Sequence, residues 1–243
     1  MTRTEELRRE VHVLTFDIFE TVLDLEGSLE RAFEDYFERK GVETDVSQFY
    51  RRYQQYLVFI QMTDAHTDTP RVPFKDLCRR SLAYQLDLEG VDYTESDLYE
   101  LLDVWWSLEY HPEVPDALDR LSDEFTIVAL SSGDRDILEA SLDPNSSPEA
   151  RFEFDEIVSA GEARTYKPAP EPYEIVLDKY DIAPNEVMHV AAHAFDIVAP
   201  KAASLRACYV DRGSRPYGEW DYDPDLTVGS IGELAGVLTS GDT

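Results

Sequence analysis

Short runs of apolar, largely β-branched residues recur along the chain, and polar or turn-forming residues follow each of them. Such runs are typical of buried strands. Segments with apolar residues at helical spacing separate the later runs, and this alternation predicts right-handed crossovers and a parallel sheet. The predicted strands are Val11–Phe16, Phe125–Leu130, Glu156–Ala160, Val187–Ala192 and Ala207–Val210, and the predicted helices between them are Asp134–Leu142, Pro172–Tyr180 and Ile197–Leu205.

The segment between the first two predicted strands has a different pattern. From Leu25 to Pro112 the apolar residues recur at helical spacing, and no run favours a strand. Four amphipathic helices are predicted there, within residues 29–41, 49–60, 77–86 and 94–105. We therefore expect an α/β protein whose Rossmann-like parallel sheet core is formed by residues 1–24 and 113–243, with residues 25–112 inserted as a helical cap.

Polar side chains come directly after several of the predicted strands. In parallel sheets, ligands bind beyond the carboxyl ends of the strands, so these side chains are the first candidates for a functional site. The candidates are Asp17, Ser131, Ser132, Lys167, His193 and Asp196.

These residue types together predict nucleophilic chemistry. A carboxylate at a strand end can attack carbon if it stays ionised, and a nearby lysine favours the ionised form. A covalent ester then divides one displacement into two easier steps. Each residue alone has an ordinary structural explanation: Asp17 as a helix cap and Lys167, before a proline, as part of a solvated turn. The coincidence of polar residues at successive strand ends favours the functional interpretation.

The charge balance is strongly acidic. The chain has 51 Asp and Glu against 22 Lys and Arg, a formal net charge of −29. Such a surface repels itself in dilute buffer, and molar salt removes most of that cost because the Debye length falls to about 3 Å. We expect adaptation to a salty medium, with an ordinary acidic protein as the alternative. Nucleic acids and anionic membranes are not expected as partners, and a small anionic substrate needs local cations.

The remaining composition predicts a cytoplasmic protein. The charged amino terminus is unlike a signal peptide, and no apolar run is long enough to span a membrane. The two cysteines, Cys78 and Cys208, show no metal-site spacing and are expected to be buried thiols. His66, with Asp64 and Asp68, is interpreted as part of a solvated turn and not as a metal loop.

Four segments carry a resemblance to the haloacid dehalogenase superfamily. They are FDIFETVLD (16–24), LSSGD (130–134), ARTYKPAPEPYE (163–174) and VAAHAFDIVAPKAA (190–203). Their order, their spacing and the helical insertion after the first segment all resemble that superfamily. The resemblance covers nearly the whole chain and implies a hydrolase with an aspartate nucleophile.

Position 19 indicates which branch of the superfamily the chain resembles. Phosphatase members carry a second aspartate two residues after the nucleophile, as an acid, and here that residue is Phe19. Halide needs no proton to leave, so an aromatic residue there suits dehalogenation. FDxFxT and AAHxxD together resemble the type II L-2-haloacid dehalogenases. This implies hydrolysis of short 2-haloacids to 2-hydroxy acids, with no metal and no cofactor.

The resemblance also implies roles for individual residues. Asp17 is the expected nucleophile, Lys167 its partner, and Asp196 orients Lys167 or the hydrolytic water. Thr21 supports the Asp17 loop, and Ser131 binds the substrate carboxylate. The remaining expected substrate-binding residues are Phe19, Arg51, Ser132, His193 and Phe195, with Tyr53 as a further pocket wall. For Arg51, on the second cap helix, a solvated helix face is an equally good interpretation.

Several positions depart from the family pattern. Glu20 stands where a glycine is usual, Ser132 where an asparagine is usual, and Ala191 and His193 replace a serine and an asparagine. These departures put the substrate in question. Two alternatives stay open: a phosphatase or other small-molecule hydrolase of the same fold, which would depend on magnesium, and a catalytically weak protein that keeps the scaffold. The sequence is also compatible with a homodimer.

Overall fold

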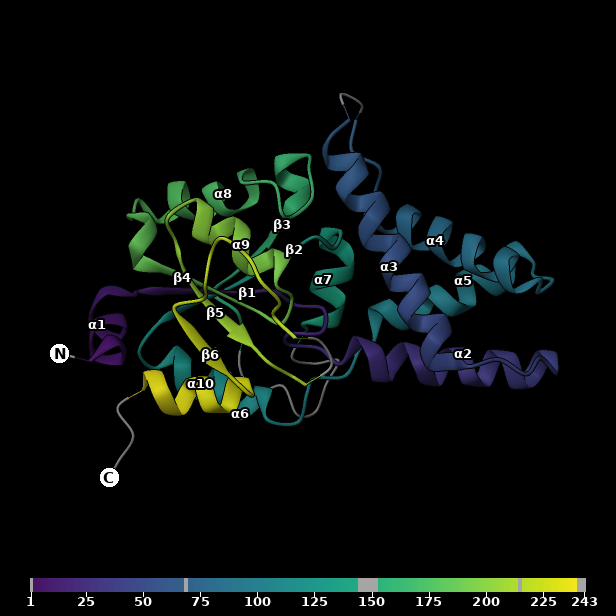
Figure 1. The fold of residues 1–243 in the computed structure, drawn as a ribbon, viewed down its shortest axis with the longest axis horizontal. Coiled ribbons are helices and arrows are strands. Elements are labelled where there is room, and N and C mark those ends of the chain that lie inside the picture. Colours follow the sequence, from purple (N-terminus) through teal and green to yellow (C-terminus); the bar gives the residue numbers. More distant parts are fainter. Residues whose placement is uncertain (1, 68–69, 144–152, 214–215, 240–243) are drawn as a thin grey trace.

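A computed structural model describes residues 2–67, 70–143, 153–213 and 216–239. Within these residues six parallel strands form one sheet with the order β3-β2-β1-β4-β5-β6 (Figure 1). The strands are β1 (Val13–Phe16), β2 (Thr126–Ser131), β3 (Glu156–Ser159), β4 (Val187–Ala191), β5 (Arg206–Val210) and β6 (Leu226–Val228).

The register brings three strand ends together. β1 lies between β2 and β4, and its last residue, Phe16, is level with Ala129 on one side and Val190 on the other. The loops after these three strands therefore leave the sheet at the same edge. This is where the sequence places Asp17, the two serines and the segment containing His193.

Both faces of the sheet are covered by helices. Along β2, Val128 and Leu130 join an apolar cluster on one face, while Ile127 and Ala129 belong to the main core on the other, as the alternation of a strand requires. Figure 1 shows α8 and α9 over one face and α6 and α10 under the other. The core helices are α1 (Arg3–Glu10), α6 (Val114–Ser122), α7 (Arg135–Ser141), α8 (Glu171–Tyr180), α9 (Phe195–Ala202) and α10 (Ile231–Leu238), with short 3-10 helices η2 (Ala160–Ala163) and η3 (Pro184–Glu186).

A group of helices stands beside the sheet and contains the inserted segment (Figure 1). It consists of α2 (Leu25–Lys40), α3 (Val46–Ala65), α4 (Phe74–Glu89), α5 (Glu95–Leu102) and the 3-10 helix η1 (Asp103–Trp106). Asp45 and Thr94 cap the amino termini of α3 and α5 through their side chains. Gly41 and Gly90, with φ of 67° and 69°, end α2 and α4 in the left-handed conformation that glycine adopts without strain. We keep residues 25–112 as the proposed bounds of this cap.

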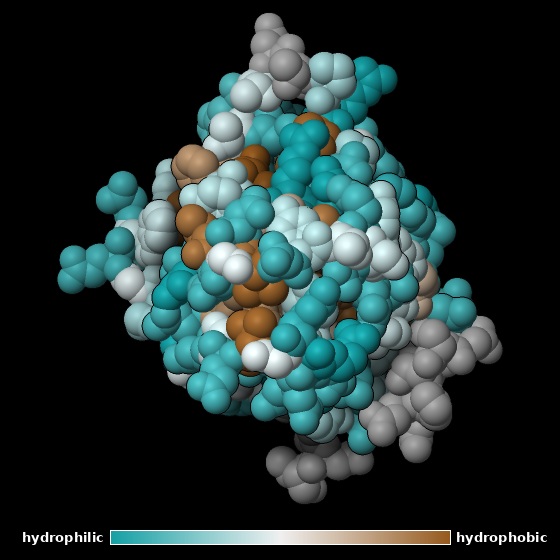
Figure 2. Space-filling view, turned by 90° about the vertical axis from the view of Figure 1, so that its right-hand side faces the viewer, coloured by the Kyte–Doolittle hydropathy of each residue, from teal (hydrophilic) through white to brown (hydrophobic). Residues whose placement is uncertain are grey.

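Apolar side chains reach the surface on the cap. Figure 2 views the cap end of the molecule and shows small brown areas within a mostly hydrophilic face. Phe59 on α3 and Leu88 on α4 are 62% and 61% exposed. Among the described residues, no helix combines the length and apolarity that crossing a membrane requires.

The α/β fold predicted from the sequence is confirmed, and the five predicted strands are present with ends shifted by at most two residues. Four elements were not predicted: α1, α6, α10 and β6. β6 spans only Leu226–Val228, too short for a periodic pattern to show. The signal for α1 was present in Thr2 and Glu5, which form a capping box in the structure.

Candidate active site

Asp17 is fixed at the end of β1 by the backbone and by one side chain. Its amide donates to the carbonyl of Val190 at 2.9 Å. The hydroxyl of Thr21 donates to Asp17 Oδ2 at 2.8 Å, and Thr21 Oγ1 accepts the amide of Ala192 at 2.9 Å. Thr21 therefore ties the loop after β1 to the loop after β4, as expected for a residue that supports the Asp17 loop.

Lys167 joins two carboxylates in the buried interior. Its Nζ lies 2.8 Å from Asp17 Oδ1 and 2.6 Å from Asp196 Oδ2, and it also donates to the carbonyl of Leu130 at 2.9 Å. Burial by itself lowers the pKa of a lysine, but the carboxylates of Asp17 and Asp196 outweigh this effect and raise the pKa of Lys167. Lys167 is therefore a cation that lies between the carboxylates of Asp17 and Asp196.

A second layer of polar groups surrounds Asp196. The hydroxyl of Tyr173 donates to Asp196 Oδ1, and His189 Nε2 lies 3.1 Å from Asp196 Oδ2. His189 Nδ1 is in turn 2.8 Å from Thr15 Oγ1. Burial favours the protonated acid, yet Lys167 and His189 hold the pKa of Asp196 well below its usual range. The Asp196 carboxylate thus contacts Lys167, Tyr173 and His189.

Ser131 is the last residue of β2, and Ser132 begins the turn that follows it. The Ser131 hydroxyl is buried and accepts the amide of Gly133 at 3.2 Å, while Ser132 Oγ accepts the amide of Lys167 at 3.3 Å. The turn passes close to the aromatic wall, because a Cβ on Gly133 would stand 2.9 Å from a ring carbon of Phe19.

A cavity of about 60 Å³ opens beside Asp17. Since a cavity needs on the order of 10–15 Å³ to hold one water molecule, this cavity accommodates only a small ligand. Its floor and walls are formed by Asp17, Phe19, Glu20, Leu25, Gln54, Leu57, Val58, Gln61, Phe74, Trp105, Ser131, Ser132, Lys167, His193, Phe195 and Asp196.

Three aromatic rings form one wall of the cavity. Phe19 stacks on Phe74 with ring centroids 5.5 Å apart and meets Trp105 edge-on at 4.9 Å. Phe74 and Trp105 come from the cap and were not predicted as site residues. Tyr53, expected as a further wall, is not a lining residue and packs inside the cap against Phe33 at 5.7 Å.

Arg51 lies outside the cavity. Its side chain is exposed and lines a neighbouring open groove of about 800 Å³. Gln54, one turn further along α3, lines both the groove and the cavity. Of the lysine and arginine residues predicted for the site, Lys167 borders the cavity and Arg51 does not.

Glu20 and His193 complete the polar lining. Glu20 has a φ of 69°, the left-handed conformation in which the glycine usual at this position is unstrained. Its carboxylate accepts a hydrogen bond from the Tyr50 hydroxyl of α3, so the core loop contacts the cap. His193 Nδ1 lies 4.0 Å from Asp17 Oδ2.

No group of three or more His, Cys, Asp or Glu side chains is arranged to hold a metal within the described residues. In the turn considered as a metal loop, His66 Nδ1 lies 2.7 Å from the carbonyl of Met62. Asp68 lies outside the described residues.

Comparisons with known proteins place the chain in a family. The family model described as haloacid dehalogenase-like hydrolase matches residues 11–204. The chain belongs to this family. It is 26% identical over 231 residues to (S)-2-haloacid dehalogenase 1 of Pseudomonas sp. (strain CBS-3), covering 94% of this chain and 96% of the relative. It is 24% identical over 221 residues to haloacetate dehalogenase H-2 of Moraxella sp. (strain B), covering 90% and 94%.

Solved structures of the haloacid dehalogenase-like family superpose over almost the whole chain. A defluorinating L-2-haloacid dehalogenase matches with a TM-score of 0.80 and 27% identity, covering 94% of this chain and 95% of that one. The L-2-haloacid dehalogenase of Xanthobacter autotrophicus with chloropropionic acid covalently bound matches with a TM-score of 0.80 and 21% identity, covering 94% and 98%. At such identities the second match shows the fold alone.

Proposed function

We propose that this chain is a hydrolytic dehalogenase of short 2-haloacids that acts through an ester on Asp17 and releases 2-hydroxy acids. The observation that carries the proposal is the buried Asp17–Lys167–Asp196 arrangement with Phe19 in the same cavity. The names of the curated relatives support the same substrate class. A substrate of this kind is small enough for the cavity.

The first step is displacement of halide. An oxygen of Asp17 attacks C2 of the substrate on the side opposite the carbon–halogen bond, so the bond to oxygen forms as halide leaves and C2 is inverted. Lys167 keeps Asp17 ionised, and the aromatic wall limits the water that would solvate it. Because halide leaves as a stable anion, no acid is needed at position 19. A phosphate ester would need one, and Phe19 has no proton to give.

The second step is hydrolysis of the ester. Water attacks the carbonyl carbon of Asp17, and the bond between this carbon and the product oxygen breaks. Asp196 is already engaged by Lys167, Tyr173 and His189. We therefore assign proton transfer to His193, whose Nδ1 is 4.0 Å from Asp17 Oδ2, a separation that one water molecule can bridge. His193 takes a proton from the water and gives it to the departing alkoxide, and the proton left on Asp17 goes to solvent.

Binding of the substrate anion requires positive charge near the cavity. We propose that Ser131 and Lys167, which line the cavity, bind the carboxylate of the substrate or the halide. We propose also that Arg51 moves its side chain toward the cavity from the neighbouring groove when substrate is bound. Its long side chain begins one turn from Gln54, which reaches the cavity. We also infer that the enzyme works in a salty cytoplasm, because of its net charge of −29.

A single turnover in heavy-oxygen water, with enzyme in excess over 2-chloropropionate, tests the mechanism. The label is expected in Asp17, and the hydroxy acid from this first turnover is expected to be unlabelled. Label found directly in that product would show that water attacks the substrate and would refute the ester.

Variants separate an enzyme from an inactive scaffold. Asp17→Asn is expected to abolish halide release, while Asp119→Asn, which changes an exposed carboxylate on α6, is expected to retain it. Activity on phosphate esters with added magnesium, and none on haloacids, would instead favour a phosphatase.

A further inference from the structure

Arg71 connects the segment before α4 of the cap to the core, beside the hydrogen bond that the Tyr166 hydroxyl donates to the Val72 carbonyl at 2.6 Å. Arg71 sends its guanidinium between two core loops, and its side chain is only 10% exposed. Nη1 lies 2.8 Å from Asp134 Oδ1, Nη2 donates to the carbonyl of Ser132 at 2.9 Å, and Nε donates to the carbonyl of Thr165 at 3.1 Å. The guanidinium also lies over the ring of Tyr166, 4.2 Å from its centre.

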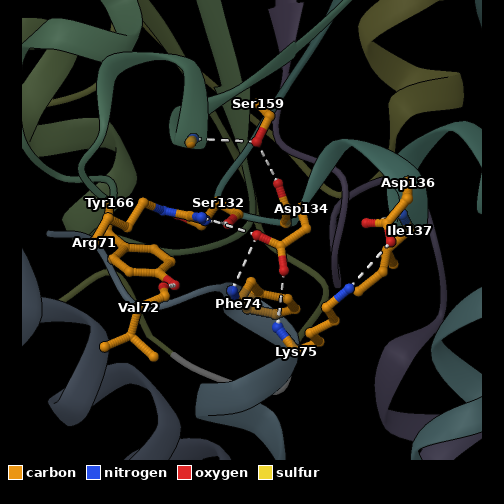
Figure 3. Close-up of polar contacts among 12 residues, drawn as sticks. Arg71, Val72, Phe74, Lys75, Ser132, Asp134, Asp136, Ile137, Ser159 and Tyr166 are labelled. Atoms are coloured by element: carbon orange, nitrogen blue, oxygen red, sulfur yellow. Dashed lines mark hydrogen bonds and ion pairs between the residues drawn. The ribbon is translucent and has the colours of Figure 1, made fainter.

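The carboxylate of Asp134 accepts hydrogen bonds both from Arg71 and from the first turn of α4. Figure 3 shows its carboxylate between Arg71 and the first residues of α4. It accepts the amides of Phe74 and Lys75, each at 3.0 Å. Asp134 precedes α7 in the core, yet its side chain makes no capping bond to α7. Pro73, the residue before α4, makes no capping hydrogen bond through its side chain. The carboxylate of Asp134, a core residue, therefore takes the place of an N-cap residue for α4.

The two core loops held by Arg71 carry Ser132 and Lys167, which both line the cavity. Ser132, whose carbonyl accepts Arg71, also accepts the amide of Lys167 through its hydroxyl at 3.3 Å. Thr165, the other backbone acceptor, is two residues before Lys167. On the cap side, Phe74 is a wall of the cavity and stacks on Phe19. Arg71 thus connects the turn after β2 to the loop that contains Lys167, and through Asp134 it is linked to Phe74 in the aromatic wall.

We propose that Arg71 is a positioning residue for the reaction assigned above. It sets the distance between Lys167 and Asp17, and it sets the place of Phe74 over the cavity, by joining the cap to both loops. This rests on the proposed dehalogenase function, although the loop geometry itself is independent of it.

Physical principles give Arg71 a role in positioning as well as in stability. A buried ion pair gains little net stability because desolvation offsets the attraction, but removing one partner leaves the other charge uncompensated and destabilises the fold. A planar guanidinium with several donors nevertheless fixes its acceptors in one geometry. Misplacement of reacting groups by about 1 Å can reduce the rate about a hundredfold. Loss of Arg71 is therefore expected to lower turnover, and Arg71→Lys, which keeps the charge beside Asp134, separates this effect from the loss of stability.

Two variants and one control test this inference in the full-length enzyme. Arg71→Met keeps an unbranched side chain over Tyr166 and removes every hydrogen-bond donor of the guanidinium. Arg71→Lys keeps a positive charge beside Asp134 without the planar guanidinium. Arg39→Met is the control, because Arg39 pairs with Glu100 at 2.6 Å within the cap and both side chains are more than half exposed. Arg71→Met and Arg39→Met change the net charge equally.

For 2-chloropropionate we expect kcat to fall by about tenfold or more in Arg71→Met, and to stay within about twofold of the parent in Arg39→Met. Arg71→Lys is expected to melt close to the parent and still to show a reduced kcat. Recovery of both melting temperature and kcat in Arg71→Lys would overturn the proposal, because charge alone would then explain the role of Arg71.

Hydrogen exchange supplies a readout that does not need activity. In Arg71→Met, peptides covering 131–134 and 164–167 are expected to exchange faster, while those from β1 and β4 stay unchanged. Unchanged exchange in these loops would overturn the positioning role even if the enzyme is active. Faster exchange in a protein whose parent releases no halide would leave the positioning geometry supported and refute the proposed function.

Discussion

At the scale of single residues, the site consists of a buried lysine between two carboxylates, Asp17 and Asp196. Asp17, Lys167 and Asp196 were predicted from strand ends and family motifs, and the structure brings them within hydrogen-bonding distance. His189 and Tyr173, which hold Asp196, were not predicted. The available signals were a histidine within the apolar strand VMHVAA and a tyrosine at the start of α8. Neither signal shows which carboxylate the side chain meets, because the partners are distant in sequence.

The Tyr173 hydroxyl provides the residue-scale prediction. Tyr173→Phe removes one hydrogen bond to the buried carboxylate of Asp196 and keeps the ring in place. Because hydrogen bonds to charged groups contribute about 1.5–3 kcal/mol, we expect the free energy of unfolding to fall by about 2 kcal/mol. We also expect a lower kcat, since Asp196 then orients Lys167 less firmly. Denaturant unfolding and halide release measure the two effects.

Tyr180→Phe is the matched control on the same helix, because the Tyr180 ring packs at the edge of the same apolar cluster. It is expected to change neither quantity appreciably. Equal effects of the two substitutions would contradict the assigned role of Tyr173.

At the scale of elements, the turn after β2 and the cap helices define the cavity together. Gly133 lies against the ring of Phe19, which is itself enclosed by Phe74 and Trp105. Helical periodicity predicted the cap helices, but it did not show which face of α3 borders the cavity. The structure turns Gln54 toward the cavity and Arg51 toward the outer groove.

Gly133 provides the element-scale prediction. In Gly133→Ala the new methyl group would stand 2.9 Å from Phe19, a ring that its neighbours hold in place. We expect overpacking to lower the free energy of unfolding by about 1–3 kcal/mol. Displacement of Phe19 is also expected to raise the KM for 2-chloropropionate.

Gly236→Ala supplies the comparison, because no atom lies within 4 Å of the added Cβ. In helix α10 this substitution is expected to stabilise the protein by up to about 1 kcal/mol. If Gly133→Ala were as stable as the parent, the close packing inferred at this turn would be wrong.

At the scale of the whole molecule, charge is the dominant feature. The chain has a net charge of −29 and only 22 lysine and arginine residues, and many of the ion pairs that these residues form are at the surface. Exposed pairs contribute little individually, so they do not offset the repulsion among the remaining carboxylates. The buried site depends less on salt, because screening is weaker there.

Salt dependence provides the prediction at this scale. The melting temperature is expected to rise steadily from dilute buffer to molar potassium chloride, as screening weakens the repulsion. A series in sucrose separates charge screening from general solvent exclusion and is expected to give a smaller rise. A melting temperature that is flat with salt would contradict adaptation to a salty medium.

The sequence by itself determined the fold class, the helical insertion after the first strand, and the identity of Asp17, Lys167 and Asp196 as a group. This was possible because periodicity is local, and because parallel strands bring their carboxyl ends to one edge. Only the tertiary structure decided that Phe74 and Trp105 enclose the cavity, that Arg51 lies outside it, and that Arg71 joins the cap to the lysine loop. These contacts depend on how helices from the cap pack against loops of the core, and residues distant in sequence carry no local pattern that encodes their distance in space.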